Sequence, residues 1–312
     1  MSQDTGSSTD TSSSPPGTST PPGDSGIELA KRRRWPLIVG ALIVVAVVAA
    51  VAGWRFLGSE SASPNETAGA TLTVVTAEGN ASEQALVEFI GREVAPRYGI
   101  KVAFRGLADS TTLNRAVSDG EVAGTVYQHK LWLSQVLEAN PDFEEVAATP
   151  VFRWGFGIWS DRYRDVADLP QNARVSLYSD PANEAQGLWL LERAGLITLK
   201  PGVDKWKATQ KDIATNPRNL QFVLLDFAAQ SRSLADFDAT VGYTEYYLAA
   251  NIDIAKQIFA PPAPDEFAGQ LTIGTRWQDT DNIKNLVAAF KDPEVQDFLR
   301  TDPRVQGILL PL

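Results

Sequence analysis

Two short segments carry polar side chains at positions where α/β proteins commonly bind ligands. His129, the single histidine, lies in Tyr127-Gln128-His129-Lys130, after a predicted strand and at the start of a predicted helix. The segment Ser179-Asp180-Pro181-Ala182-Asn183-Glu184 also joins a strand to a helix. Ligands of open α/β sheets bind outside the carboxyl ends of strands, and a helix N-terminus offers free N–H groups to an anion. A purely structural role stays open for both, since Asp-Pro-x-Asn is a helix-starting turn and a single histidine is commonly a packed side chain.

Aromatic side chains are a third feature that could contact a ligand. The chain has eight tryptophans, and core packing accounts for most of them. Trp154 and Trp159 flank a predicted crossing between two lobes. Aromatic walls are usual for ligands bound at such a junction.

The composition argues against an enzyme. The chain has no cysteine, which excludes thiolate catalysis, disulfides and thiol-based metal sites. It contains no nucleophile elbow, no phosphate-binding Walker loop and no dinucleotide-binding glycine motif. The formal net charge of -10 disfavours broad binding to nucleic acid, which needs clustered Lys and Arg. We therefore predict a non-enzymatic protein with no cofactor, no metal and no nucleic-acid partner.

The elements that position these residues alternate between strand and helix periodicity from Thr71 onward. Asn80 and Glu83 form a capping-box pattern that predicts a helix start. This order of elements predicts mostly parallel sheets covered by helices, and the length favours two lobes. The predicted strands are 72–76, 100–104, 122–126, 156–160, 174–178, 221–225, 239–243 and 271–275. One helix is predicted after residue 80, a second from residue 110, a third over 130–139 and a fourth over 183–194, which ends at Gly195. A final pair of helices is predicted over 281–300.

The N-terminal part of the chain has the pattern of a membrane anchor. Residues 1–26 are almost wholly Ser, Thr, Pro, Gly and Asp, which predicts a disordered tail. The basic cluster at 31–34 precedes an uncharged, apolar span from Trp35 to Trp54, long enough for one membrane-spanning helix. The positive-inside rule places the tail in the cytoplasm and the globular part outside. The alternative is a cleaved signal peptide, with small-residue cleavage patterns at 50–52 and 61–63.

At its polar segments the chain resembles the NlpA/MetQ family, the methionine-binding lipoproteins that serve ABC importers. The resemblance covers the chain from Leu72 to its end. It implies a two-lobed periplasmic-binding-protein-like (type II) α/β fold that closes on a small solute by hinge motion, with two crossing strands expected near 153–159 and 270–275. The matching motifs are 119–121, 127–130, 179–184, 190–197, 212–213, 216–220 and 232–234.

The chain also departs from the family at several positions. It lacks the cysteine that carries the family's lipid, and the predicted helix takes over the anchoring. The family motif N-D-P-x-N-x-x-R supplies an arginine for the amino-acid carboxylate, and the matching residue here is Gln186. Losing a charge-assisted pair with a carboxylate implies altered specificity. Tyr243 stands where the family has an asparagine and Ser110 where it has a tyrosine, whereas Tyr127, His129 and Asn183 are retained.

We thus predict a membrane-anchored, extracytoplasmic solute-binding component of an ABC importer. Its partners are an amino acid, dipeptide or related solute, an ABC permease with its ATPase, and the membrane through the N-terminal helix. The alternative is a solute-sensing or partner-recognition module that no longer delivers to a transporter. The predicted ligand-binding residues are Tyr127, His129, Asn183, Gln186, Tyr243, Ser110 and Trp154. The predicted parts are a cytoplasmic tail 1–34, a membrane helix 35–57, a tether 58–70, a first lobe 71–155 plus 272–312, and a second lobe 156–271.

Overall fold

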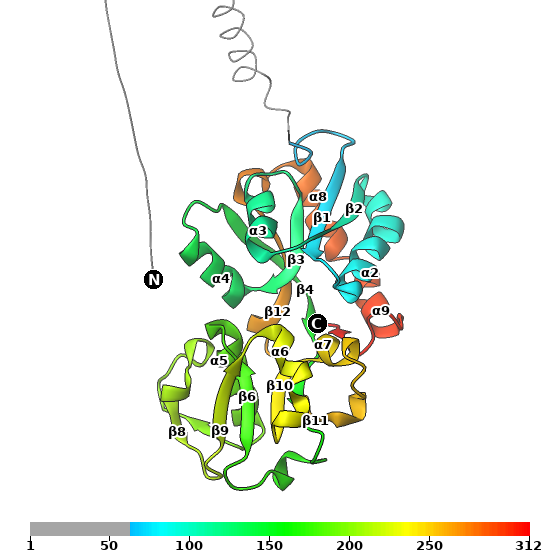
Figure 1. Cartoon of the computed structure of the whole chain (residues 1–312). Coiled ribbons are helices and arrows are strands. Elements are labelled where there is room, and N and C mark those ends of the chain that lie inside the picture. Colours follow the sequence, from blue (N-terminus) through cyan, green and yellow to red (C-terminus); the bar gives the residue numbers. More distant parts are fainter. Residues whose placement is uncertain (1–62) are drawn as a thin grey trace, which may run out of the picture. The chain divides into compact units, whose positions relative to one another are not determined.

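Two separate β-sheets form the framework of the computed structural model, which describes residues 63–312 (Figure 1). The six-stranded sheet has the order β13-β4-β12-β3-β1-β2, and the five-stranded sheet has the order β11-β5-β10-β6-β9. We call the parts built on them the six-stranded lobe and the five-stranded lobe. Helices pack against each sheet, as the predicted alternation of strands and helices requires.

The two lobes differ in which parts of the sequence they use. The six-stranded lobe contains β1 (Thr71–Ala77), α2 (Ala81–Phe89), β2 (Lys101–Leu107), α3 (Ser110–Ser118), β3 (Gly124–His129), α4 (Lys130–Ala139), β4 (Glu145–Trp154), β12 (Ala268–Gly274), α8 (Asp281–Phe290), α9 (Pro293–Thr301) and β13 (Leu309–Leu310). The five-stranded lobe contains β5 (Phe156–Trp159), β6 (Arg174–Tyr178), α5 (Pro181–Arg193), β9 (Gln221–Leu225), α6 (Phe227–Arg232), β10 (Ala239–Tyr243), α7 (Thr244–Ala249) and β11 (Gln257–Phe259), with a small hairpin of β7 (Thr198–Leu199) and β8 (Ile213–Thr215).

Both main sheets are mixed, so the prediction of mostly parallel sheets is wrong. The pairs β1–β2, β1–β3, β6–β9 and β6–β10 are parallel. The pairs β3–β12, β4–β12, β4–β13, β5–β10 and β5–β11 are antiparallel. A strand that enters a sheet from the other lobe has no crossover helix before it. Parallel neighbours need such a crossover connection and antiparallel neighbours do not, so these strands pair antiparallel.

The long strand β4 was not predicted, because it contains Pro150. A proline cannot donate a ladder hydrogen bond and is normally confined to edges or bulges. Here the register between β12 and β4 shifts beside Pro150, since Gly269 pairs with Phe152 whereas Gln270 pairs with Pro150. The irregularity accommodates the proline inside a central strand.

The chain passes between the lobes at two places. It leaves the six-stranded sheet at Trp154 and enters the five-stranded sheet at Phe156, inside the predicted range 153–159. Only glycine fits between them, because a Cβ on Gly155 would lie 2.7 Å from both a backbone oxygen of Gly307 and Oγ1 of Thr244. The return runs through residues 260–267, earlier than the predicted 270–275, because β12 belongs wholly to the six-stranded sheet.

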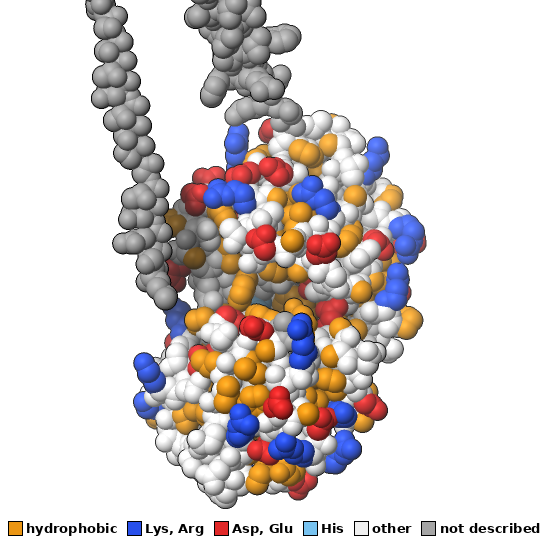
Figure 2. Space-filling view, in the orientation of Figure 1, with side chains coloured by type: hydrophobic (Ala, Val, Ile, Leu, Met, Phe, Trp, Pro, Cys, Tyr) orange, Lys and Arg blue, Asp and Glu red, His pale blue; other side chains and the backbone are white. Residues whose placement is uncertain are grey.

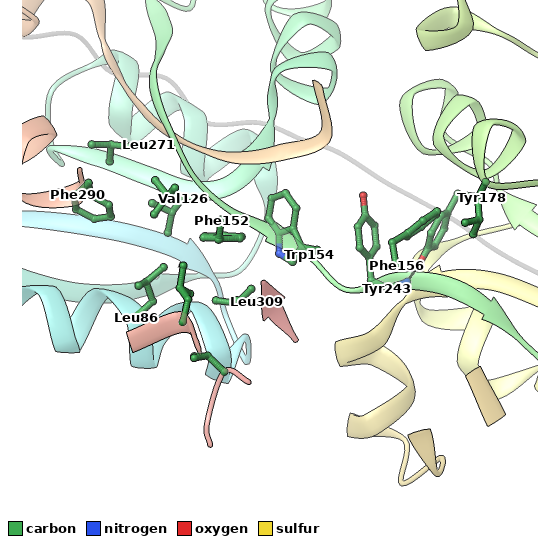
Figure 3. Packing of buried hydrophobic residues seen from close by; sticks show 14 of the residues in the cluster. Leu86, Val126, Phe152, Trp154, Phe156, Tyr178, Tyr243, Leu271, Phe290 and Leu309 are labelled. Atoms are coloured by element: carbon green, nitrogen blue, oxygen red, sulfur yellow. Dashed lines mark hydrogen bonds between the residues drawn. The ribbon is translucent and has the colours of Figure 1, made fainter. Parts of the chain in front are cut away.

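A row of aromatic rings continues the hydrophobic core from one lobe into the other. Figure 3 shows Trp154 at the end of β4 facing Tyr243, with Phe156 and Tyr178 beyond it. The ring centroids of Tyr243 lie 5.9 Å from Trp154, 4.8 Å from Phe156 and 5.7 Å from Tyr178. The side chains at the junction are therefore positioned by packing from both sheets.

Helix ends follow the local signals in the sequence. Asn80 caps α2 by accepting from Glu83 N, and Asp180 caps α5 by accepting from Asn183 N. Helix α5 begins at Pro181, two residues earlier than predicted, because proline suits the first helical turn. Gly195 terminates it with the predicted left-handed conformation, at φ 71°.

The predicted membrane span Trp35–Trp54 and the tail before it lie outside the described residues. Within residues 63–312, no helix is both long enough and apolar enough to span a bilayer.

Candidate ligand-binding site

A cavity of about 410 Å³ lies between the two lobes. Its wall comes from the ends of β1, β3 and β4, the turn before α3, and α2, α3 and α4 on one side, and from α5, α6, β10 and α7 on the other. This is the expected place for a ligand, at the carboxyl ends of strands. The lining residues are Ala77, Asn80, Glu83, Ala108, Asp109, Ser110, Leu113, Tyr127, Gln128, His129, Trp132, Trp154, Asn183, Phe227, Tyr243, Glu245 and Tyr246.

The structure brings all but one of the predicted ligand-binding residues to this cavity. The exception is Gln186, which is 1% exposed and does not line it. Gln186 lies behind Tyr243, whose hydroxyl is 2.8 Å from the Gln186 Oε1 acceptor. The predicted residues in the wall are Ser110, Tyr127, His129, Trp154, Asn183 and Tyr243.

His129 serves both the fold and the cavity. Its Nδ1 accepts from the backbone N–H of Trp132 at 3.1 Å and so caps α4. Burial lowers the pKa of His129 to about 4, so the ring is neutral at pH 7. Because Nδ1 is an acceptor, the neutral ring carries its hydrogen on Nε2, which lies 3.4 Å from Oδ1 of Asn183 in the other lobe.

A buried polar cluster surrounds Asn183 at the start of α5. The Asn183 Nδ2 group donates to Asp180 at 2.8 Å, and its Oδ1 accepts from the Tyr243 hydroxyl at 2.5 Å. Burial raises the pKa of Tyr243, so the phenol stays protonated and remains a donor. The single hydroxyl hydrogen is shared between Asn183 Oδ1 and Gln186 Oε1, which lies 2.8 Å from the phenol oxygen. One buried oxygen of Asp180 has no partner among the described residues.

Sequence reasoning missed two glutamates that face the cavity from opposite lobes. Glu83 of α2 is 1% exposed, and its Oε1 accepts from Trp154 Nε1 at 3.0 Å. Glu245 of α7 accepts from the hydroxyl and the backbone N–H of Ser82 at 2.9 and 3.3 Å. The capping-box pattern had assigned Glu83 a local role only. Glu245 follows the strand end at Tyr243, and that position could have identified it.

Aromatic residues were also missed in the wall. Trp132, Phe227 and Tyr246 line the cavity. The rings of Trp132 and Phe227 approach edge to face across the lobes, with centroids 6.1 Å apart. Their signal was the same as for His129 and Tyr243, since each lies within the first turn of a helix that follows a strand.

Two side chains near the first crossing lie away from the cavity. Trp159 is fully buried and stacks on Tyr247 with ring centroids 4.2 Å apart, so the prediction that it walls the ligand site is wrong. Arg153, beside Trp154 on β4, donates to the carbonyl of Pro311 at 3.1 Å and pairs with Asp265, so it gives the cavity no positive charge. Both side chains leave the junction because their strand positions direct them to other neighbours.

Known proteins with similar sequences include binding proteins, as the cavity between the lobes suggests. A family model described as NlpA lipoprotein matches residues 72–311. The methionine-binding lipoprotein MetQ of Bacillus subtilis (strain 168) is 29% identical over 280 residues, covering 88% of this chain and 98% of that protein. The D-methionine-binding lipoprotein MetQ of Escherichia coli (strain K12) is 28% identical over 219 residues, covering 69% and 80%.

Solved structures share the fold. An ABC transporter periplasmic substrate-binding protein from Coxiella burnetii aligns with a TM-score of 0.68 at 29% identity, covering 77% of this chain and 100% of that chain. The relatives are binding proteins, which confirms the prediction that this chain is not an enzyme. The α/β periplasmic-binding-protein-like fold is confirmed as well. Since the family model matches most of the sequence, this chain belongs to the NlpA lipoprotein family.

Proposed function

We propose that this protein is the extracytoplasmic solute-binding component of an ABC importer. The observation that carries the proposal is the cavity between two lobes, with walls from both, in a chain related to a periplasmic substrate-binding protein of an ABC transporter. A solute held there is enclosed on both sides, which suits capture and delivery by hinge motion.

Contacts across the cavity support a closing motion. Ser82 of the six-stranded lobe donates to Glu245 of the five-stranded lobe, and His129 approaches Asn183 in the same way. The aromatic pair of Trp132 and Phe227 also crosses between the lobes, so both polar and apolar contacts hold the lobes together around the cavity. We propose that the apolar span Trp35–Trp54 keeps the protein at the outer face of the membrane beside its permease.

We further propose that free methionine is not the tight ligand of this protein, although relatives are named for it. In the family motif an arginine holds the amino-acid carboxylate. Gln186 at the matching position carries no charge, and Tyr243 lies between it and the cavity. Neutral hydrogen bonds contribute about 0.5–1.5 kcal/mol, against about 1.5–3 kcal/mol for charge-assisted ones.

The test is to identify a bound solute. The full chain, purified in detergent, is analysed by mass spectrometry for co-purifying small molecules and titrated with amino acids, dipeptides and related solutes. We expect a thermal shift and a change of tryptophan emission with at least one solute. A protein that carries no solute and responds to none contradicts the proposal. Solute binding without any transport defect on deletion favours the sensing module instead.

A further inference from the structure

The cavity wall contains a buried carboxyl group with one oxygen that accepts no hydrogen bond from a described residue. Glu83 lines the cavity and is 1% exposed. Its Oε1 accepts from Trp154, but its Oε2 has no hydrogen-bond partner among residues 63–312. A buried polar atom without a partner is costly and needs an explanation, and a ligand donor in the adjacent cavity supplies one.

A second carboxyl group faces the same space from the other lobe. Glu245 lines the cavity, and Ser82, the neighbour of Glu83, holds one of its oxygens at 2.9 Å. Burial raises the pKa of Glu83 well above its ordinary value, and the charge of Glu245 adds to this effect. Burial also raises the pKa of Glu245. Two like charges brought together in a poorly solvated space oppose each other's ionisation.

The described cavity wall offers no positive charge to balance them. Lys and Arg side chains are spread over the visible surface (Figure 2), yet the lining residues include neither. His129, the remaining basic side chain in the wall, is neutral at pH 7 because burial lowers its pKa to about 4. The acidic lining residues are Glu83, Glu245 and, at an exposed position, Asp109.

Aromatic rings complete the wall around the carboxyl groups. The face of an aromatic ring attracts a cation within about 6 Å of its centroid. Trp154 is a direct neighbour of Glu83, and Tyr246 directly follows Glu245. The aromatic residues of the wall are Tyr127, Trp132, Trp154, Phe227, Tyr243 and Tyr246.

We propose that the cavity selects a small organic cation, a protonated amine whose ammonium group lies between Glu83 and Glu245 and whose apolar part packs on the aromatic wall. This inference rests on the proposed function, since it names the ligand class of the same cavity. An ammonium N–H would satisfy Oε2 of Glu83, which no described side chain does.

Amine binding between these two carboxyl groups depends on pH. The titratable group whose charge acts on Glu83 is Glu245 of α7, and both glutamates add to burial in raising the pKa of Tyr246. Hydrogen bonds from Trp154 of β4, Asn80 and Thr76 of β1 partly offset the effect of burial on the pKa of Glu83. Without ligand, Glu83 therefore stays protonated at pH values above its ordinary pKa, whereas a bound ammonium group favours the ionised form of Glu83. Amine binding releases a proton, and affinity rises with pH. A carboxylate ligand held by the protonated acid would show the opposite slope.

The experiment uses four probes that share one thioether side chain. L-Methionine carries both charged groups, L-methioninamide masks the carboxylate, and 3-(methylthio)propylamine keeps only the ammonium. 3-(Methylthio)propanoate has a carbon chain of the same length as the propylamine and carries a carboxylate as its only charged group. Calorimetry with the full chain in detergent, in two buffers of different ionisation enthalpy, gives affinity and proton release. We expect the amine to bind at least tenfold more tightly than the propanoate. A trimethylammonium analogue separates recognition of N–H donors from recognition of charge alone.

Matched variants separate the site from general effects of buried acids. Glu83→Gln and Glu245→Gln keep the size of the side chain and remove the ionisable group. Each should weaken amine binding at least tenfold and reduce proton release. Glu145→Gln is the control, because Glu145 is buried but does not line the cavity. Thermal melting of each variant checks folding, and the two cavity variants serve as independent tests.

The outcomes distinguish the two levels of the proposal. Tighter binding of the propanoate or of methionine, or unchanged amine affinity in both cavity variants, overturns the cation inference and leaves a solute-binding function intact. A co-purified solute without a cationic group does the same. Failure of every probe and every library solute overturns both.

Discussion

Restoring the family's arginine tests how Tyr243 and Gln186 determine specificity. Gln186 is 1% exposed, and the phenol of Tyr243 lies between it and the cavity, with the hydroxyl 2.8 Å from Oε1. Gln186→Arg alone therefore places a guanidinium behind an aromatic ring, where a ligand carboxylate cannot reach it. Gln186→Arg combined with Tyr243→Asn shortens the side chain in front and opens that path.

The magnitudes follow from hydrogen-bond energies. Because Gln186 makes no bond to a ligand in the cavity, a new charge-assisted bond to the carboxylate in the double variant gains about 1.5–3 kcal/mol, or roughly 10- to 150-fold in methionine affinity. In the single Gln186→Arg variant the buried charge lacks a full partner, and such a group destabilises a protein by about 3–5 kcal/mol. Asp180, whose charge acts on Tyr243, offsets part of that cost.

The parent, both single variants and the double variant form a thermodynamic cycle. Calorimetry with L-methionine measures the affinity of each protein, and chemical denaturation measures its stability. We expect the double variant to gain affinity beyond the sum of the singles, and Gln186→Arg alone to lose stability without gaining affinity. Equal gains in the single and double variants would show that Tyr243 does not block the arginine. No gain in the double variant would refute the assignment of position 186 to carboxylate recognition.

Three further expectations concern pH and fluorescence. Burial raises the pKa of Glu145 to about 8, so the stability that its protonated form contributes is lost as pH rises from about 4.5 to 8. In urea titrations, Glu145→Gln should raise the free energy of unfolding at pH 8 by about 5 kcal/mol at most and leave it unchanged at pH 4. Burial lowers the pKa of His129 to about 4, so the stability that its neutral form contributes is lost as pH falls from about 6.5 to 4. In His129→Gln, the fall in the free energy of unfolding over this pH range should be smaller by up to about 3 kcal/mol. Trp154→Phe should reduce the ligand-induced change in tryptophan emission and Trp159→Phe should preserve it, because Trp154 lines the cavity together with Trp132 whereas Trp159 does not. The reverse pattern would place the ligand elsewhere.

The parts of the fold that could be predicted from sequence are those with local signals. Helix α4 spans Lys130–Ala139 and strands β6 and β10 span Arg174–Tyr178 and Ala239–Tyr243, as their patterns predict. The capped ends of α2 and α5 likewise follow from Asn80 and Asp180. Strand β4 escaped prediction because Pro150 is tolerated only through a register shift with β12, and that shift depends on a partner strand far away in sequence.

The candidate site was predictable to a similar extent. His129, Asn183 and Tyr243 lie at ends of strands or starts of helices, and topology brings such positions together at the junction of two sheets. Trp154 and Trp159 could not be distinguished by sequence, because both lie near the same crossing. The first ends β4 at the cavity, and the second packs on Tyr247 inside the five-stranded lobe.

The side chain of Glu83 does not take the helix-capping role that the local sequence pattern predicts for it. The capping-box pattern is half satisfied: Asn80 accepts from the backbone N–H of Glu83 at 3.3 Å, while the backbone N–H of Asn80 donates to Ala77 O at 3.2 Å. The Glu83 carboxyl is thereby released from the helix end and turns to Trp154, a residue distant in sequence. A helix needs only the asparagine to begin there, so the glutamate is free to serve the cavity. The same backbone would accept Gln at position 83 with little loss of stability, and a large loss of ligand affinity in that variant would separate the two roles.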